Sequence, residues 1–320
     1  MYSLGIDIGG TKCAVTLGRD SVPDNPQELI IAKKKFPTDV KRGYKQIIDE
    51  FFRTADELLE ENEIRYNELI GIGISCGGPL DSKKGVIMSP PNLPDWDNVP
   101  IVDIFSKHFG VKTVLQNDAN ACAVAEWKFG SGKGMENVIF LTFGTGMGAG
   151  LILNGKLYSG TNDLAGEVGH IRLTDDGPTG YGKRGSFEGY CSGGGIVDLA
   201  GIIIESSKSR GIGTVLTEQN ETLSAKSIAL AAKSGDAVAQ EIYRVSAVHL
   251  GKALSILIDI LNPEAIIIGS IYTRDRALFD DIIKDVISKE ALTAAAEVCK
   301  ILPGTLCEFV GDIAALSLLF

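Results

Sequence analysis

The feature that most constrains the fold of this chain is a strand–glycine turn–strand pattern that occurs twice. Short apolar runs joined by glycine-rich turns are typical of β-hairpins. The two copies are runs 4–8 and 13–17 around the turn 9–12, and runs 138–143 and 148–153 around the turn 144–146. Because the pattern opens each half of the chain, it indicates two related α/β halves that arose by duplication.

The composition supports a soluble globular protein of about two domains. The chain has 320 residues, of which 44% are hydrophobic and 22% charged. A net charge of −10 disfavours nucleic-acid binding, because it repels a phosphate backbone. The six cysteines form no C-x-x-C pair and predict free thiols in a reducing cytoplasm. With no basic leader and no apolar stretch near 20 residues, neither a signal peptide nor a membrane span is expected.

Hydrophobic periodicity places further elements between and after the two hairpins. The division between the halves falls near Gln116, which gives an N-terminal domain over 1–116 and a larger domain over 117–310, while a C-terminal helix over about 311–320 can pack back on the first domain. A lysine-rich run is expected to be a solvated edge strand, and a Gly- and Pro-rich segment to be a functional loop. The expected elements are edge strand 29–36, helix 44–59, strand 69–74, loop 76–100, strand 111–115, helix 119–127, helix 237–261, strand 265–268 and helix 312–319.

The two glycine turns indicate phosphate binding. Glycine allows close approach of the backbone, and successive N–H groups with a threonine hydroxyl form an anion-binding nest. Asp7, just before the first turn, is compatible with phosphates if Mg²⁺ lies between them. A single turn would be only a tight hairpin, but two at matching places favour loops that grip one ATP. The P-loop motif does not occur, and the G-x-G-x-x-G/A matches at 180–185 and 144–149 lack the strand-then-helix context of an NAD site.

Several motifs together make the chain similar to the ROK family of sugar kinases and repressors, within the actin-like ATPase superfamily. The resemblance extends over nearly the whole length. Its motifs are LGIDIGGTK at 4–12, GGP at 77–79, PNLP at 91–94, QNDANA at 116–121, FGTGMGAG at 143–150 and AGEVGH at 165–170. The resemblance implies a two-domain α/β fold of the actin-like, ribonuclease H-like type, with ATP·Mg²⁺ and a sugar in a cleft between the domains.

The same resemblance implies roles for individual residues. From spacing alone, the Asn117-Asp118 pair after a strand and before a helix is an N-cap; the resemblance instead implies that Asp118 is the catalytic base. The implied sugar-binding residues are Gly78, Asn92, Asn117, Asp118, Glu167, His170 and Glu188. The implied nucleotide-binding residues are Asp7 (also a candidate Mg²⁺ ligand), Gly9, Gly10, Thr11, Lys12, Gly144, Thr145, Gly146 and Gly269.

One departure from the family concerns structural zinc. The family commonly carries C-x-C-G-x-x-G-C-x-E, in which three thiolates and the histidine bind the metal. Here Thr179, Tyr181 and Ser186 occupy the three cysteine positions, while Glu188 is retained. The expectation is therefore a loop without zinc, held by packing and hydrogen bonds.

These observations lead to an ATP-dependent hexose kinase as the expected activity, with the 6-hydroxyl of glucose as the favoured acceptor. An N-acetylmannosamine or N-acetylglucosamine kinase and a fructokinase remain alternatives. A sugar-responsive repressor is a further alternative, disfavoured because the Asp7 motif leaves no room for a preceding DNA-binding domain. Family members are usually dimers, so a cytoplasmic homodimer is expected.

Overall fold

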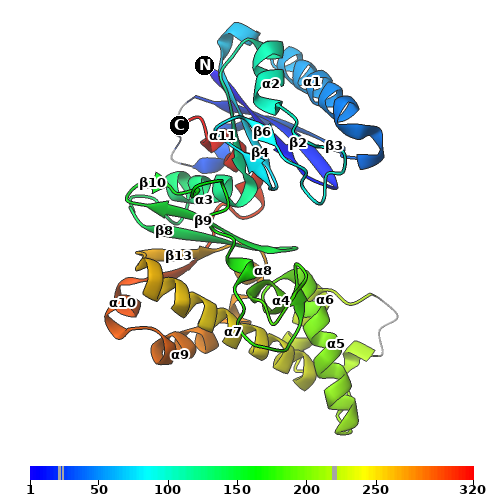
Figure 1. Ribbon diagram of the computed structural model, residues 1–320, viewed down its shortest axis with the longest axis vertical. Helices are drawn as coiled ribbons and strands as arrows, with labels where there is room; N and C mark the ends of the chain where they lie inside the picture. Colours follow the sequence, from blue (N-terminus) through cyan, green and yellow to red (C-terminus); the bar gives the residue numbers. More distant parts are fainter. Residues whose placement is uncertain (21–22, 24, 218–221) are drawn as a thin grey trace. The chain divides into compact units, whose positions relative to one another are not determined.

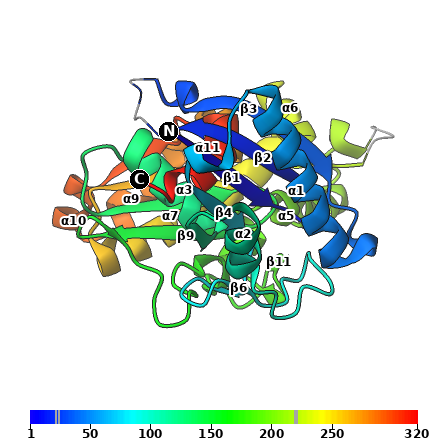
Figure 2. The ribbon, with the colours of Figure 1, turned by 90° about the horizontal axis from the view of Figure 1, so that it is seen from above.

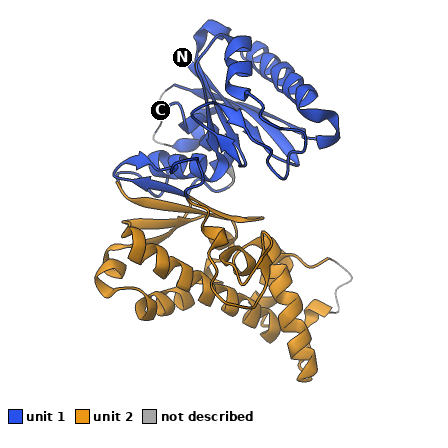
Figure 3. Ribbon diagram, in the orientation of Figure 1, with its two compact units in different colours: residues 1–134, 150–165, 305–320 blue, residues 135–149, 166–304 orange. Residues whose placement is uncertain are grey.

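The computed structural model describes residues 1–20, 23, 25–217 and 222–320 (Figure 1). Its contacts divide the chain into two compact units (Figure 3). Unit 1 contains residues 1–134, 150–165 and 305–320, and unit 2 contains residues 135–149 and 166–304. Both ends of the chain therefore belong to unit 1.

Unit 1 is built on a five-stranded sheet in the order β3-β2-β1-β4-β7. Its strands are β1 (Tyr2–Ile8), β2 (Lys12–Arg19), β3 (Ile30–Pro37), β4 (Leu69–Cys76) and β7 (Thr113–Asn117). β1 and β2 form the antiparallel hairpin that the first glycine turn predicts. β1, β4 and β7 are parallel neighbours, and their last residues, Ile8, Cys76 and Asn117, are register partners. The segments that follow these three strands therefore start side by side.

Alternation along β1 sends its side chains to opposite faces of the sheet. Leu4, Ile6 and Ile8 belong to the core under α1 (Gly43–Glu61) and α2 (Ile101–Phe109). The other face is covered by α3 (Asp118–Phe129) and α11 (Val310–Ser317). Figures 1 and 2 show α1 and α11 on opposite sides of these strands.

Glycines on the strands allow α11 to approach the sheet closely. A Cβ atom at Gly5 would lie 3.1 Å from the Cγ atom of Leu316, and one at Gly18 would lie 2.7 Å from its Cδ1 atom. At Gly73 it would lie only 1.9 Å from the main-chain oxygen of Ala315. The last helix of the chain is thus an integral layer of unit 1.

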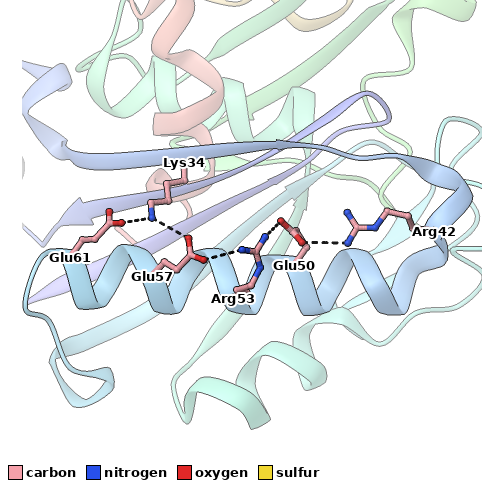
Figure 4. A network of polar contacts seen from close by, with 6 residues as sticks. All are labelled: Lys34, Arg42, Glu50, Arg53, Glu57 and Glu61. Atoms are coloured by element: carbon pink, nitrogen blue, oxygen red, sulfur yellow. Dashed lines mark hydrogen bonds and ion pairs between the residues drawn. The ribbon is translucent and has the colours of Figure 1, made fainter.

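β3 is the edge strand, as its lysines predict, but two of them are paired rather than solvated. Lys33 forms an ion pair with the buried Asp312 of α11. On the opposite face, the Nζ atom of Lys34 lies 2.6 Å from Glu61 Oε1 and 3.2 Å from Glu57 Oε2. The chain of ion pairs continues along α1 through Arg53, Glu50 and Arg42 (Figure 4). Being largely exposed, each pair on α1 contributes about 1 kcal/mol at most.

Unit 2 contains a parallel set of strands in the order β8-β13-β14. These are β8 (Val138–Phe143), β13 (Ala265–Ile268) and β14 (Lys300–Pro303). β9 (Met147–Leu153) follows the second glycine turn, and its end pairs with β10 (Lys156–Leu157) in unit 1. The bounds predicted for β8, β13 and the long helix α7 (Ala237–Leu261) are confirmed without shift. α7 packs against α5, α6 and α9.

The remaining elements are mostly short. The segment predicted as a loop over 76–100 contains two-residue strands as well as turns. The strands and α-helices not yet named are β5 (Leu80–Asp81), β6 (Val86–Ile87), β11 (Thr179–Gly180), β12 (Lys183–Arg184), α4 (Phe187–Tyr190), α5 (Gly193–Ser209), α6 (Ala225–Lys233), α8 (Ile271–Asp275), α9 (Asp280–Glu290) and α10 (Thr293–Val298). None of the helices in the described part of the chain combines the length and apolarity that crossing a bilayer requires.

Candidate active site

The first glycine turn lies against the loop that carries Asn92. A Cβ atom at Gly10 would lie 2.8 Å from both the Cβ atom and the main-chain oxygen of Asn92. At Gly9 it would lie 2.7 Å from the oxygen of Lys12, within the turn itself. Thr11 and Lys12 are exposed at the tip of the turn. The main-chain oxygen of Thr11 accepts a hydrogen bond from the Thr38 N–H at 3.0 Å. Only glycine fits at Gly10 without displacing the Asn92 backbone.

Asn117 and Asp118 join β7 to α3, and their side chains have different partners. Asn117 is the N-cap: its Oδ1 atom accepts from the N–H groups of Ala119 at 2.9 Å and Asn120 at 3.4 Å. Asp118 is the first helical residue, and its Oδ1 atom accepts from Ala119 N at 2.8 Å. The Asn117 amide therefore retains its Nδ2 group as a donor, and Asp118 keeps Oδ2 for another partner.

Gly77 and Gly78, after β4, lie beside these polar groups. A Cβ atom at Gly78 would lie 3.4 Å from Asn117 Nδ2, and one at Gly77 would lie 4.0 Å from Asp118 Oδ2 and 3.8 Å from Asn92 Nδ2. The structure thus brings together, within unit 1, the predicted residues that follow β1, β4 and β7. The missing side chains leave room for a ligand to approach the amides and the carboxylate.

Electrostatics distinguish the two carboxylates of this cluster. Desolvation by the surrounding protein atoms raises the pKa of Asp118, opposed by the hydrogen bond from the Ala119 N–H, although the side chain itself is accessible to solvent. The pKa of Asp7 is raised to about 6, first by burial and then by the charges of Asp118 and Asp312, against Lys33 and Lys12. A cation beside Asp7 would favour its ionised form.

Asp7 has the donor chemistry for Mg²⁺. This ion is usually held through one or two carboxylates, with water and substrate phosphate oxygens completing its octahedron. Among the residues that the structure describes, no group of three or more His, Cys, Asp or Glu side chains is placed to hold a metal. A single carboxylate such as that of Asp7 is compatible with a Mg²⁺ ion whose other ligands are water and substrate phosphate oxygens.

The second glycine turn, between β8 and β9, is held by Glu188 and by the start of α5. The Gly144 N–H donates to Gly146 O at 3.2 Å, and Gly144 O accepts from Gly193 N–H at 2.7 Å. Glu188 Oε2 accepts from the Met147 N–H at 3.0 Å. A Cβ atom at Gly146 would lie 2.9 Å from that same oxygen. Glu188, which is predicted to bind the sugar, thus also holds the second glycine turn, whose middle residue, Thr145, is exposed.

The segment that carries Glu167 and His170 packs beside the same turn. Glu167 precedes a short 3₁₀ helix, η4 (Val168–His170). A Cβ atom at Gly169 would lie 2.3 Å from the Met147 oxygen and 3.3 Å from the Cβ atom of Glu188. Within unit 2, the segment that carries Glu167 and His170 therefore packs, through Gly169, against Met147 and Glu188 at the start of β9.

Two segments outside the predicted set also meet the second turn. Ser270 follows Gly269 with φ of 57°, and a Cβ atom at Gly144 would lie 3.6 Å from its Oγ atom. Ser192 caps α5, whose first residue, Gly193, bonds to Gly144. The sequence signal is limited to the serine, a residue typical of an N-cap, and to the glycines after it, which let another backbone approach closely.

Comparison with known proteins identifies the class and then the family. The fold is the two-domain actin-like ATPase fold of ROK sugar kinases. One solved structure, a ROK family glucokinase from Streptomyces griseus in complex with glucose and AMPPNP, matches with a TM-score of 0.77 and 29% identity, covering 99% of each chain. The ROK family pattern matches residues 3–319, and the chain belongs to the ROK family.

Individual relatives include enzymes and regulators. A glucokinase from Thermotoga maritima is 30% identical over 319 residues, which cover 99% of this chain and 96% of that protein. The DNA-binding transcriptional repressor Mlc from Escherichia coli is 28% identical over 253 residues, covering 78% of this chain and 61% of the repressor. The relatives of this chain therefore include both a sugar kinase and a transcriptional repressor, the two functional classes that the sequence suggests.

Proposed function

We propose that this protein is an ATP-dependent sugar kinase that transfers the γ-phosphoryl group of ATP to a hexose hydroxyl. The observation that carries the proposal is the solvent-accessible carboxylate of Asp118, with its raised pKa, beside Asn92, Asn117 and the first glycine turn. A sugar hydroxyl is a weak nucleophile, so phosphoryl transfer benefits from a base that orients it and accepts its proton. Similarity to glucokinases over the whole chain supports the same activity.

In the proposed step, Asp118 Oδ2 accepts the proton of the sugar hydroxyl as its oxygen bonds to the γ-phosphorus. The bond between that phosphorus and the bridging oxygen of ADP breaks, and ADP leaves with the electron pair. Asn117 Nδ2 and Asn92 orient the sugar, and backbone N–H groups of the turn at Gly9–Thr11 and those of Thr145 and Gly146 bind phosphate oxygens. When bound at Asp7, Mg²⁺ supplies charge neutralisation for the phosphates.

We propose glucose, phosphorylated at its 6-hydroxyl, as the favoured substrate. Amides, two carboxylates and an imidazole suit a neutral polyhydroxylated ligand. The amides are those of Asn92 and Asn117 in unit 1, and the carboxylates and the imidazole are those of Glu167, Glu188 and His170 in unit 2. N-acetylmannosamine, N-acetylglucosamine and fructose are the alternative acceptors, because tolerance of a 2-acetamido group depends on loop placement.

The proposal is tested with a panel of hexoses and N-acetylhexosamines incubated with ATP and Mg²⁺. ADP release should require both the metal and a sugar, and NMR of the product should show a phosphate ester at one hydroxyl, the 6-position for glucose. Absence of stimulation by every sugar would remove the kinase assignment; sugar-dependent DNA binding by the same preparation would favour a regulator.

We also propose that the protein acts in the cytoplasm as a homodimer that binds its sugar without nucleic acid. Cys13, Cys76 and Cys191 are buried thiols that form no disulfide, which is compatible with a reducing compartment. Light scattering of the purified chain gives the oligomeric state directly, and a mass of 34.0 kDa would identify a monomer.

We expect the purified protein to contain no stoichiometric structural zinc. Such a site needs about four N or S ligands, and hydroxyls of Thr179, Tyr181 and Ser186 are poor replacements for thiolates because they stay protonated near neutral pH. Sugar-dependent activity should therefore survive a zinc chelator once Mg²⁺ is restored. Elemental analysis that finds about one zinc per chain, with unfolding on its removal, would contradict this expectation.

A further inference from the structure

The turn that carries His170 is bonded to the β11–β12 hairpin by a lysine. The Nζ atom of Lys183, in β12, donates a hydrogen bond to the main-chain oxygen of His170 at 2.7 Å. His170 is the last residue of η4, where carbonyl groups lack partners inside the helix. A lysine ammonium is a good partner for this carbonyl, because a hydrogen bond from a charged donor is stronger than one between neutral groups.

The hairpin that presents Lys183 is itself firmly held. The hydroxyl of the buried Ser186 donates to Gly180 O at 3.3 Å and accepts from the N–H of Gly189 at 3.1 Å. The Phe187 N–H donates to Ile171 O at 2.8 Å. These bonds connect the hairpin, α4 and the residue that directly follows His170.

The imidazole of His170 makes an aromatic contact with the hairpin. Its ring lies edge-on to Tyr181, with ring centroids 5.0 Å apart. Tyr181 is 65% exposed, so this contact is only partly shielded from water. The ammonium–carbonyl bond is therefore the directional interaction from the hairpin to His170 itself, and it adds to the Phe187–Ile171 bond in fixing the backbone from which the imidazole projects.

We propose that Lys183 is a positioning residue for sugar binding, which acts by holding the His170 carbonyl and thereby the direction of the imidazole. The proposal rests on the proposed function, because it assigns His170 to the sugar. Lys183 touches the main chain of His170 and has no part in proton or phosphoryl transfer. Its loss should affect sugar affinity rather than the chemical step.

The test compares Lys183→Met with Lys183→Arg and with Lys226→Met, a matched change at an exposed lysine of α6. Lys183→Met should raise the KM for the sugar about tenfold, the effect of losing one hydrogen bond to a charged group. The KM for ATP and kcat should stay near the wild-type values. Lys183→Arg keeps a charged donor and should restore much of the affinity, whereas Lys226→Met should change none of these constants.

A second measurement remains informative if no sugar proves to be a substrate. Amide hydrogen exchange at residues 168–171, without any ligand, should be faster in Lys183→Met than in the wild type and in Lys226→Met. Unchanged exchange together with an unchanged KM for the sugar would overturn the proposal. Faster exchange in a protein that phosphorylates no sugar would support the structural role of Lys183 and refute only the kinase assignment. If Lys183→Met does not fold, Lys183→Gln provides the same comparison.

Discussion

Replacing Asp118 with asparagine should lower kcat for sugar phosphorylation by about 100-fold or more. The amide has nearly the size of the carboxylate and can still contact a sugar hydroxyl, but it cannot accept the proton. Asn117, and not Asp118, caps α3 with its side chain, so the helix should still form. Steady-state kinetics with saturating sugar and ATP measure kcat, and calorimetry of sugar binding should show a much smaller loss of affinity.

A matched control is Asp49→Asn, which changes an exposed carboxylate of α1. Its kcat and thermal stability should equal those of the wild type. If Asp118→Asn retains most of its kcat, Asp118 is only a residue of the helix start, and the base lies elsewhere. A loss of kcat accompanied by a lowered melting temperature would instead report damage to α3.

Replacing Gly73 with alanine should destabilise unit 1 strongly. The added Cβ atom would lie 1.9 Å from the main-chain oxygen of Ala315, and a backbone atom cannot rotate away as the end of a side chain can. β4 and α11 must therefore separate, and overpacking of this kind lowers the free energy of unfolding by about 1–3 kcal/mol or more. Urea denaturation followed by circular dichroism should show a lower midpoint.

Gly213→Ala is the control for the glycine-to-alanine change itself. Gly213 is exposed, and a Cβ atom there would meet nothing within 4 Å. The same urea experiment should therefore give a midpoint close to that of the wild type. Equal midpoints for Gly73→Ala and Gly213→Ala would show that α11 does not pack against β4 as described.

Long or strongly patterned segments were predictable from the sequence. α7 has a sustained apolar pattern, and β8 and β13 are continuous apolar runs, so local composition determines both type and bounds. α5 was not predicted, because its three glycines at 193–195 resemble a turn and its capping bond becomes visible only in the folded chain. β14, which ends at Pro303, is too short and too interrupted to carry a strand pattern.

Candidate site residues were predictable where the signal is local. The glycine turns at 9–12 and 144–146, and the polar pair Asn117-Asp118 between a strand and a helix, are legible in the chain because turn and cap chemistry depends on neighbouring residues. The lysines of β3 indicate an edge strand, but the sequence does not indicate their ion-pair partners. Their alternation along β3 sends Lys33 to Asp312 of α11 and Lys34 to α1, and these partners are remote in sequence.

The sequence by itself determined the family, the α/β class and the positions of the glycine turns, since these depend on local pattern and short-range chemistry. Only the tertiary structure decided which distant residues meet. The parallel register of β1, β4 and β7 aligns Ile8, Cys76 and Asn117, and so gathers the residues that follow them. The hydrogen bonds from the Met147 N–H to Glu188 and from Lys183 to the His170 carbonyl likewise depend on how separate segments pack. Side-chain direction and strand order carry no signal in any single stretch of chain.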